Sequence, residues 1–306
     1  MKRALIATLF NEADNVSRWW DGLMRQTVWP DEICIVDGGS TDGTWEKLQE
    51  RARHSPVPVK LQQQRCNIAA GRNLAIQMTE AEIIAATDAG SFPEPVWFGE
   101  ITQPLVENAG LDVVGGRSVP LVENEFQREL LQLDGPEPEP QSEAQIFPSS
   151  RNIAFRRDAW AAVGGYPEWL TLTAEDALFN FELHAVGKTF LYNRAAVVHW
   201  PTRENAPAYF KMLYHYGRGA AEARLYAPYY CRRLLITLCP LLLLLSQHRF
   251  RHLQFRYQKN AASALGWVNG WLRGRRPPAD WKKVRGNLLS PEAQKSLIKV
   301  GGKLAK

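Results

Sequence analysis

Cysteine is scarce in this chain of 306 residues, which contains four cysteines in total. These four residues, Cys34, Cys66, Cys231 and Cys239, form no C-x-x-C pair. Closely paired cysteines are typical of zinc sites, and regularly spaced ones of disulfide-linked secreted domains. We therefore expect buried thiols in a reducing compartment, and we exclude a zinc-binding or disulfide-linked scaffold.

A long apolar run is missing as well. About 20 predominantly apolar residues are needed to span a bilayer, whereas the longest run here, 234–245, holds 12 residues and contains Pro240. Near the start of the chain, the apolar stretch 4–10 is too short for a signal peptide, and no cleavage-like site follows it. The sequence thus predicts neither a spanning helix nor a secretion signal, and we expect a cytoplasmic protein.

Acidic residues are rare in the last third of the chain. Residues 203–306 contain 20 of the 37 Lys and Arg residues but only 4 of the 32 Asp and Glu residues. We therefore expect two parts, a domain over 1–202 and a basic, helical appendage over 203–306. A net charge of about +16 on the appendage calls for an anionic partner.

That partner is expected to be the inner face of the cell membrane. Arginines flank the apolar run 234–245, and Trp267 and Trp271 follow it in an amphipathic stretch. This combination is typical of a segment that lies in the membrane interface. The alternative is that the run packs against protein, with its basic neighbours solvated.

Strand and helix patterns alternate over the first 200 residues. This alternation predicts an α/β fold with a doubly wound, mainly parallel sheet. A polar, proline-broken loop is expected at 137–142. The expected strands are 4–10, 33–36, 59–63, 82–87, 111–119, 152–155 and 190–200, and the expected helices are 11–24, 44–51, 67–78, 95–107, 158–163 and 175–186.

The segment CIVDGGSTDGT, residues 34–44, joins a strand to a helix and contains two aspartates and three glycines. It has neither the Gly-Lys-Ser/Thr of a P-loop nor the glycine spacing of a dinucleotide fingerprint. In an open α/β sheet, ligands bind beyond the carboxyl ends of the strands. Asp42 is explained as a cap of the following helix. Asp37 is an acceptor suited to an N–H donor such as the imide of uracil, unless it bonds nearby backbone N–H groups instead.

Seven motifs in one order carry a resemblance to a known family. They are FNEADNV (10–16), VDGGSTDGT (36–44), AAGRNLA (69–75), ATDAG (86–90), RNIAFRR (151–157), GGYPEWL (164–170) and AEDALFN (174–180). This order resembles glycosyltransferase family 2, and within it the succinoglycan-biosynthesis type, over roughly residues 3–202. The resemblance implies the GT-A fold and transfer of a sugar from a nucleotide-diphosphate donor, with inversion at the anomeric carbon.

The resemblance also implies a set of donor-binding residues. Two of them have alternative explanations, since Asn11 could cap a helix and Arg72 could pair with a surface carboxylate. The family positions that hold the base, ribose and diphosphate match Thr8, Asn11, Glu12, Asp37, Gly39, Arg72, Asp88 and Ala89.

The resemblance implies a divalent metal, Mg²⁺ or Mn²⁺, but this chain offers fewer ligands for it than is usual for the family. The family pattern Asp-x-Asp supplies two carboxylates, whereas this chain has Asp88-Ala89-Gly90 and lacks the second one. Asp88 and His199 match the family's metal-binding positions. A lone histidine at a strand end is equally compatible with a structural role.

The Glu175-Asp176 pair matches the catalytic pair of the family, with Asp176 as the general base. Inverting transfer needs a carboxylate that takes the proton of the acceptor hydroxyl. The alternative is that both residues simply favour the first turn of a helix. Asn152 and Arg156 are assigned to the acceptor or donor-sugar side.

Three classes of function follow. The first is an inverting glycosyltransferase that uses a nucleotide sugar, expected to be UDP-linked, and a saccharide or lipid-linked acceptor. The second is a non-catalytic nucleotide-sugar-binding or scaffold protein, which the glycine at position 90 permits. The third, a nucleic-acid-binding protein, rests on the basic appendage alone. We expect no nucleic-acid partner, because no reading motif is present.

Overall fold

The structure, a computed structural model, describes residues 1–135, 139–241 and 252–278. The expected loop 137–142 and the apolar run 234–245 therefore lie partly outside the described residues. The chain forms two compact units, which are described separately. Unit 1 comprises residues 1–121, 136–168 and 179–201, and unit 2 comprises 122–135, 169–178 and the residues from 202 onward. The last change of unit falls between Pro201 and Thr202, and unit 2 also takes in two segments from the first 200 residues.

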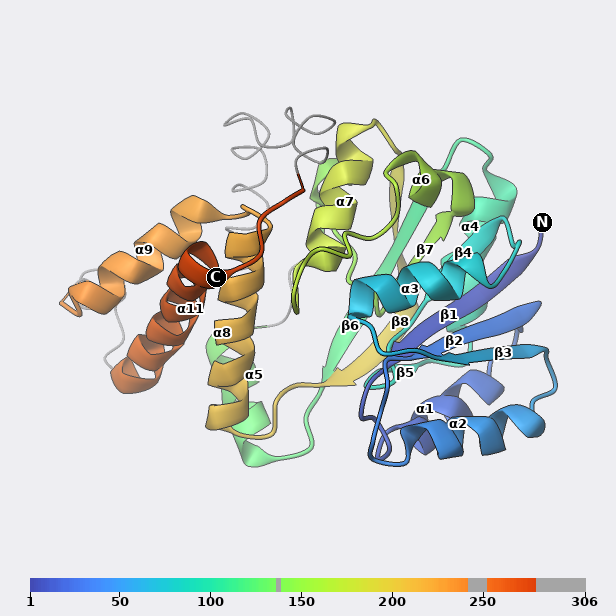
Figure 1. Cartoon of the computed structure of the whole chain (residues 1–306), viewed down its shortest axis with the longest axis horizontal. Helices are drawn as coiled ribbons and strands as arrows, with labels where there is room; N and C mark the ends of the chain where they lie inside the picture. Colours follow the sequence, from blue (N-terminus) through green and yellow to red (C-terminus); the bar gives the residue numbers. More distant parts are fainter. Residues whose placement is uncertain (136–138, 242–251, 279–306) are drawn as a thin grey trace. The chain divides into compact units, whose positions relative to one another are not determined.

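Unit 1 is built on one eight-stranded sheet (Figure 1). Its order is β3-β2-β1-β4-β7-β6-β8-β5. The strands are β1 (Arg3–Leu9), β2 (Glu32–Asp37), β3 (Val59–Gln63), β4 (Ile83–Ala86), β5 (Phe92–Pro93), β6 (Val113–Leu121), β7 (Ile153–Arg156) and β8 (Phe190–Pro201).

The sheet is parallel in one half and mixed in the other. Strands β3, β2, β1 and β4 all run parallel. Strand β7 runs antiparallel to both β4 and β6, and the short β5 runs antiparallel to β8. The expected α/β sheet is present, with its parallel half at the end that carries the Asp37 loop. Strand direction in the other half could not be read from the sequence, because a buried strand has the same residue pattern in either direction.

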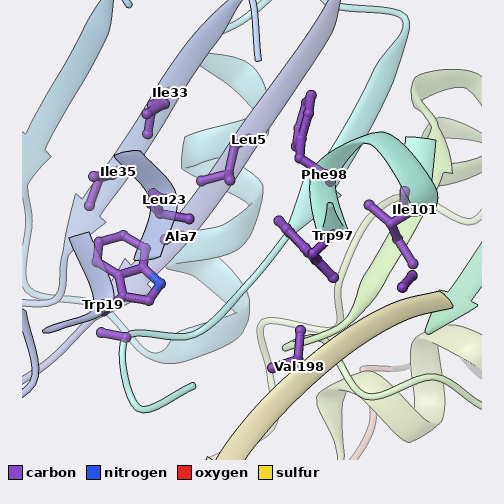
Figure 2. Packing of buried hydrophobic residues seen from close by; sticks show 14 of the residues in the cluster. Leu5, Ala7, Trp19, Leu23, Ile33, Ile35, Trp97, Phe98, Ile101 and Val198 are labelled. Carbon is purple, nitrogen blue, oxygen red and sulfur yellow. The ribbon is translucent and has the colours of Figure 1, made fainter. Parts of the chain in front are cut away.

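Helices cover both faces of this sheet. Alternate residues of β1 point to opposite faces, so that Leu5 and Ala7 belong to one core cluster and Ala4 and Ile6 to the other. The first cluster also contains Trp19 and Trp97, which Figure 2 shows, and Leu48. The helices are α1 (Val16–Met24), α2 (Thr44–Arg53) and α4 (Trp97–Glu107) on this face, and α3 (Ile68–Gln77), α6 (Arg157–Ala162) and most of α7 (Glu175–Ala185) on the other.

The first helix is shorter than expected. It begins at Val16 with Asn15 as its N-cap residue, whereas the sequence pattern placed its start at Asn11. Asn11 has a φ of +54°, which is incompatible with a helix interior. The residues between β1 and α1 therefore form a loop beyond the carboxyl end of β1.

The described residues of unit 2 are mainly helical. Helices α8 and α11 approach each other closely at glycines: a Cβ atom at Gly217 would lie 2.2 Å from the Ser263 carbonyl oxygen, and one at Gly266 would lie 1.9 Å from that of Tyr214. Among the described residues, no helix is both long enough and apolar enough to cross a membrane. The helices of this unit are α5 (Glu125–Asp134), the first turn of α7, α8 (Ala206–Glu222), α9 (Ala227–Leu238) and α11 (Leu253–Arg273).

Candidate active site

Asp37 is the last residue of β2 and is fully buried, with an exposed fraction of 0%. Its Oδ1 atom accepts hydrogen bonds from the backbone N–H groups of Gly39 and Ser40, each at 2.7 Å. Gly39 has a φ of +92°, a conformation that side-chain-bearing residues rarely adopt. The Oδ2 atom is buried and has no hydrogen-bond partner among the described residues. One carboxylate oxygen thus shapes the loop, and the other is a candidate acceptor for a ligand.

Thr8 supplies a second unsatisfied polar atom on the neighbouring strand. In the β1–β2 register, Thr8 lies opposite Val36, next to Asp37. The Thr8 Oγ1 atom is buried and has no hydrogen-bond partner in the described part of the chain. Since buried polar atoms are almost always paired, two such atoms at adjacent strand ends make this edge of the sheet a candidate binding site.

The loops after β1 and β2 are tied together. Asn11 accepts a hydrogen bond from the Thr41 N–H through Oδ1 at 3.0 Å, and its own N–H donates to Ser40 Oγ at 2.8 Å. Helix capping is therefore the wrong explanation for Asn11, because Asn15 occupies that position. The side chain of Glu12 accepts from Asn15 Nδ2 at 2.7 Å. Asn11 thus ties the loop after β1 to the loop that follows Asp37, and a direct contact of Asn11 or Glu12 with the ribose stays a prediction.

Asp42 joins the same two loops from the other side. Its Oδ1 accepts from the Thr44 N–H and hydroxyl, and its Oδ2 accepts from the Ala13 N–H at 3.0 Å. The N-cap position of α2 belongs to Gly43, which has a φ of +94° and no side-chain cap. Burial alone would raise the pKa of Asp42, but these hydrogen bonds outweigh it and lower the pKa. Asp42 is therefore structural, as the sequence indicated, although it bridges loops and does not sit at the cap position.

Arg72 and Asp88 form an ion pair beyond the carboxyl ends of the parallel strands. Arg72 lies on α3 and is 3% exposed, and its Nη2 atom is 3.0 Å from Asp88 Oδ1. Asp88 follows β4, whose last residue, Ala86, lies opposite Ile6 of β1. The guanidinium also lies 5.5 Å from the centre of the Tyr166 ring. Arg72 was assigned from the sequence to the diphosphate, and Asp88 to the metal. In the structure their charges neutralise each other.

The metal-binding potential of this edge is small. Gly90 supplies no carboxylate, and the Nε2 atom of His199 lies 2.9 Å from Glu94 Oε1. Within residues 1–135, 139–241 and 252–278, no group of three or more His, Cys, Asp or Glu side chains is arranged to hold a metal ion. Hard divalent cations require several oxygen ligands. Asp88 and His199 are engaged with Arg72 and Glu94, so this donor set does not fit a metal held by the protein alone.

Two residues assigned to the sugar or acceptor side have other roles. Arg156 donates to the carbonyl oxygens of Leu111 and Asn108, and it pairs in the sheet with Ile83 at the start of β4. It therefore lies at the edge opposite Asp88, which argues against its assignment to the site. Asn152 is buried, and its amide accepts from Trp97 Nε1 at 2.8 Å and donates to two backbone carbonyl oxygens. Its polar atoms are used inside the domain, which argues against a contact with substrate.

The Glu175-Asp176 pair lies in the first turn of α7, in the segment that belongs to unit 2. Glu175 is buried, and Asp176 Oδ1 accepts from the Ala177 N–H at 2.7 Å. The preceding residue, Ala174, has a φ of +74°. Strain of this kind in a non-glycine residue costs of order 1–2 kcal/mol and tends to occur at functional sites. The backbone is thus bent sharply where it presents the two carboxylates.

Tyr226 is a neighbour of Asp176 that the sequence did not indicate. It is the N-cap residue of α9 and has a φ of +56°. Burial, and then the negative charge of Asp176, raise the pKa of the Tyr226 hydroxyl above its usual value. No sequence signal pairs this tyrosine with Asp176, because the two residues lie 50 positions apart in the chain.

Part of the sequence matches a known protein family. The sequence model of glycosyl transferase family 2 matches residues 5–164, slightly more than half of the chain. The succinoglycan biosynthesis protein ExoA of Rhizobium meliloti (strain 1021) is 24% identical over 234 residues, which cover 71% of this chain and 68% of ExoA. A further curated relative is 27% identical over 116 residues, and the chain spans only 38% of the length of that relative.

Two solved structures share the fold. The mannosyltransferase PcManGT from Pyrobaculum calidifontis, in complex with GDP-Man and Mn²⁺, matches with a TM-score of 0.59 and 15% identity, covering 99% of this chain and 84% of that one. S. aureus TarS 1–349 in complex with UDP-GlcNAc matches with a TM-score of 0.53 and 16% identity, covering 99% and 80%. The fold is therefore the GT-A fold, and with the family match over residues 5–164 the chain belongs to glycosyl transferase family 2.

Proposed function

We propose that the chain is an inverting glycosyltransferase that moves a sugar from a nucleotide-diphosphate donor, UDP-linked in the first instance, to a saccharide or lipid-linked acceptor. Binding of the nucleotide-sugar donor is supported by one observation. The Oδ2 atom of Asp37 is buried at the carboxyl edge of the sheet and has no hydrogen-bond partner among the described residues. A base N–H placed there would satisfy it. The two solved structures that share the fold hold UDP-GlcNAc and GDP-Man, which supports a nucleotide sugar as the ligand.

The hydrogen bonds of Asp37 favour uracil over guanine. Two backbone N–H groups already occupy Oδ1, so a single carboxylate oxygen remains. Uracil presents one N–H donor on its pairing edge, which matches one acceptor. Guanine presents two adjacent N–H donors and is best held by both oxygens of a carboxylate. The Asp37 loop therefore supports a uridine nucleotide.

The diphosphate is assigned to Arg72. Departure of the nucleoside diphosphate leaves negative charge on its oxygens, and a guanidinium offers several N–H donors to such oxygens. Asp88 holds the Arg72 side chain at the sheet edge at 3.0 Å, so little side-chain freedom is lost when the diphosphate binds. A divalent cation, when bound, would supply additional positive charge. Because the donor set does not fit such an ion, no step is assigned to it.

Proton removal is assigned to Asp176. The acceptor hydroxyl must lose a proton as its oxygen attacks the anomeric carbon, and a carboxylate is a suitable base for this step. The oxygen forms the new glycosidic bond, the bond between the anomeric carbon and the diphosphate breaks, and the proton moves to Asp176. Glu175 is buried beside it and contributes to the electrostatics of the same turn.

A membrane-surface location is the remaining part of the proposal. On α9, Leu235 and Leu238 are 59% and 73% exposed, and Leu241 follows them with its side chain also exposed. Arg232 is exposed on the same helix, and the region from residue 203 carries the large excess of positive charge. Exposed leucines together with basic residues favour docking on an anionic lipid surface. Such docking would bring a lipid-linked acceptor to the enzyme.

The test begins with the purified full chain and a panel of nucleotide sugars. A donor that binds should raise the melting temperature, because it binds the folded state only. Transfer or hydrolysis of that donor, lost in Asp176→Asn, would support the enzyme over the alternative of a non-catalytic nucleotide-sugar-binding protein. Binding of the donor with no turnover in any acceptor extract would favour the binding protein, an option that the glycine at position 90 keeps open.

A further inference from the structure

The loop that precedes Asp176 is held by α8 within unit 2. Thr171 donates two hydrogen bonds to Glu222: its N–H to Oε2 and its hydroxyl to Oε1, each at 2.9 Å. Two residues further along, the Thr173 hydroxyl donates to the His215 carbonyl oxygen at 2.9 Å. A Cβ atom at Gly219 would lie 2.1 Å from the Thr173 hydroxyl oxygen, so the loop rests directly on the helix. Segment 171–173 is thus fixed at three points on α8.

Glu222 stands where physical chemistry disfavours a glutamate. It is the last residue of α8, and the carbonyl groups at a helix C-terminus repel negative charge. Its side chain is also 0% exposed, with Arg218 Nε at 3.3 Å as its ion-pair partner. A buried carboxylate is costly unless it is paired and hydrogen-bonded. A local rule broken in this way, with both oxygens directed at one threonine, indicates a role beyond helix stability.

Backbone strain is concentrated around the same contact. Ala174, which lies between the anchored segment and the Glu175-Asp176 pair, has a φ of +74°. Arg224 and Tyr226, which follow Glu222 in the chain, have φ values of +58° and +56°. Such conformations persist only when the surrounding contacts enforce them. The two bonds between Glu222 and Thr171 join the two strained segments.

We propose that Glu222 is a positioning residue that holds the segment 171–174 in the conformation that presents Asp176 for catalysis. It acts through Thr171 and does not touch the substrate. The proposal rests on the role of Asp176 as the general base. The carboxylate form is required, because only it can accept from the Thr171 N–H and from the Thr171 hydroxyl through separate oxygens while pairing with Arg218.

The test compares Glu222→Gln and Thr171→Val with the wild-type chain in donor–acceptor steady-state kinetics. Misplacement of a catalytic group costs about ten- to hundredfold in rate. We expect kcat to fall by about that factor in Glu222→Gln while the KM for the donor changes by less than about twofold. The acidic limb of the pH profile of kcat should also move, since it reports the base. Thr171→Val, which retains the N–H bond, should show a smaller fall in the same direction.

Asp134→Asn is the matched control. Asp134 lies on α5 of the same unit, where it forms an ion pair with Lys259 and accepts from the Tyr209 hydroxyl at 2.8 Å. This variant should lower the melting temperature without altering kcat or the pH profile. The double variant Thr171→Val, Glu222→Gln should be no slower than Glu222→Gln alone, because both changes act on one contact.

Two outcomes would overturn the proposal and separate it from the assignment of Asp176. If Asp176→Asn is inactive but Glu222→Gln retains the kcat and pH profile of the wild type, Glu222 is structural only. If Asp176→Asn retains full turnover, the base assignment fails and the positioning role fails with it. Should Glu222→Gln prove insoluble, a wild-type kcat in Thr171→Val would count against the proposal.

Discussion

Arg72 and Asp88 form a partly buried ion pair: the guanidinium Nη2 lies 3.0 Å from the carboxylate Oδ1, and the arginine is 3% exposed. In the family pattern, the carboxylate at this position is followed two residues later by a second one, whereas here Gly90 follows. The positive charge beside Asp88 in unit 1 therefore comes from a side chain of α3. This arrangement leads to the first prediction.

Arg72→Ala should weaken the binding of UDP but not that of uridine. Loss of a charge-assisted hydrogen bond to the diphosphate is worth about 1.5–3 kcal/mol, and uridine carries no phosphate. Isothermal titration of both ligands measures the difference. Arg25→Ala, which changes an exposed arginine, serves as the control. An equal loss for uridine and UDP would mean that Arg72 only supports the fold of the site.

Asp37→Asn should exchange the base preference of the site. The amide oxygen can replace Oδ1, which accepts from Gly39 and Ser40, so the loop is retained. The amide NH₂ group then replaces Oδ2 and opposes the uracil N–H, at a cost of about 1–3 kcal/mol. Cytosine has an acceptor at the same position and should bind better than in the wild type. Competition between UDP and CDP measures the exchange, and equal weakening of both would contradict it.

Asp176→Asn should lower turnover at least about a hundredfold while donor binding is maintained. The amide has the size of the carboxylate but does not take the proton. Asp158→Asn is the matched control, since Asp158 is also an acidic residue in the first turn of a helix. If both variants lose activity equally, the helix dipole and not proton transfer explains Asp176. The product linkage, read by NMR, should be inverted relative to the donor.

Gly90→Asp should increase the effect of Mn²⁺ on donor binding. A Cβ atom at position 90 meets no atom within 4 Å, and Gly90 is not among the glycines with positive φ, so the substitution is sterically free. The added carboxylate would give the ion a second oxygen ligand beside Asp88. Gly90→Asn controls for size without charge. A wild-type enzyme that is inactive in chelator and fully restored by Mn²⁺ would contradict the expectation of weak metal dependence.

Leu235→Gln combined with Leu238→Gln should reduce binding to vesicles that contain acidic lipid. Both side chains are exposed on α9, so the change removes insertion without disturbing a core. Leu191→Gln, at an exposed leucine of unit 1, should bind as the wild type does. Wild-type binding should weaken with salt, because basic residues contribute to it. If the wild-type chain does not bind vesicles that contain acidic lipid at low salt, the proposal of membrane docking is wrong.

The sequence by itself determined the alternation of strands and helices and the loop of Asp37. Buried β-branched runs and amphipathic periods are local signals, and they located the strand Val59–Gln63 to the residue and six others within a few residues. They did not predict the two-residue strand β5 (Phe92–Pro93). Seven motifs in one order determined the family, which the match over residues 5–164 confirmed. Local patterns also indicated that Asp37 serves the loop backbone or a ligand; the structure shows the backbone role for Oδ1, and the ligand role of Oδ2 stays a prediction.

Only the tertiary structure decided which polar side chains pair with each other and which edge of the sheet they occupy. Nothing in the strand pattern showed that Arg156 lies at the far edge of the sheet, because its place follows from the antiparallel register of β7 with β4. The pairing of Arg72 with Asp88 joins residues 16 positions apart, and that of Thr171 with Glu222 joins residues 51 positions apart. Such contacts depend on which elements pack together, and that choice is made by the summed burial of many side chains rather than by any one of them.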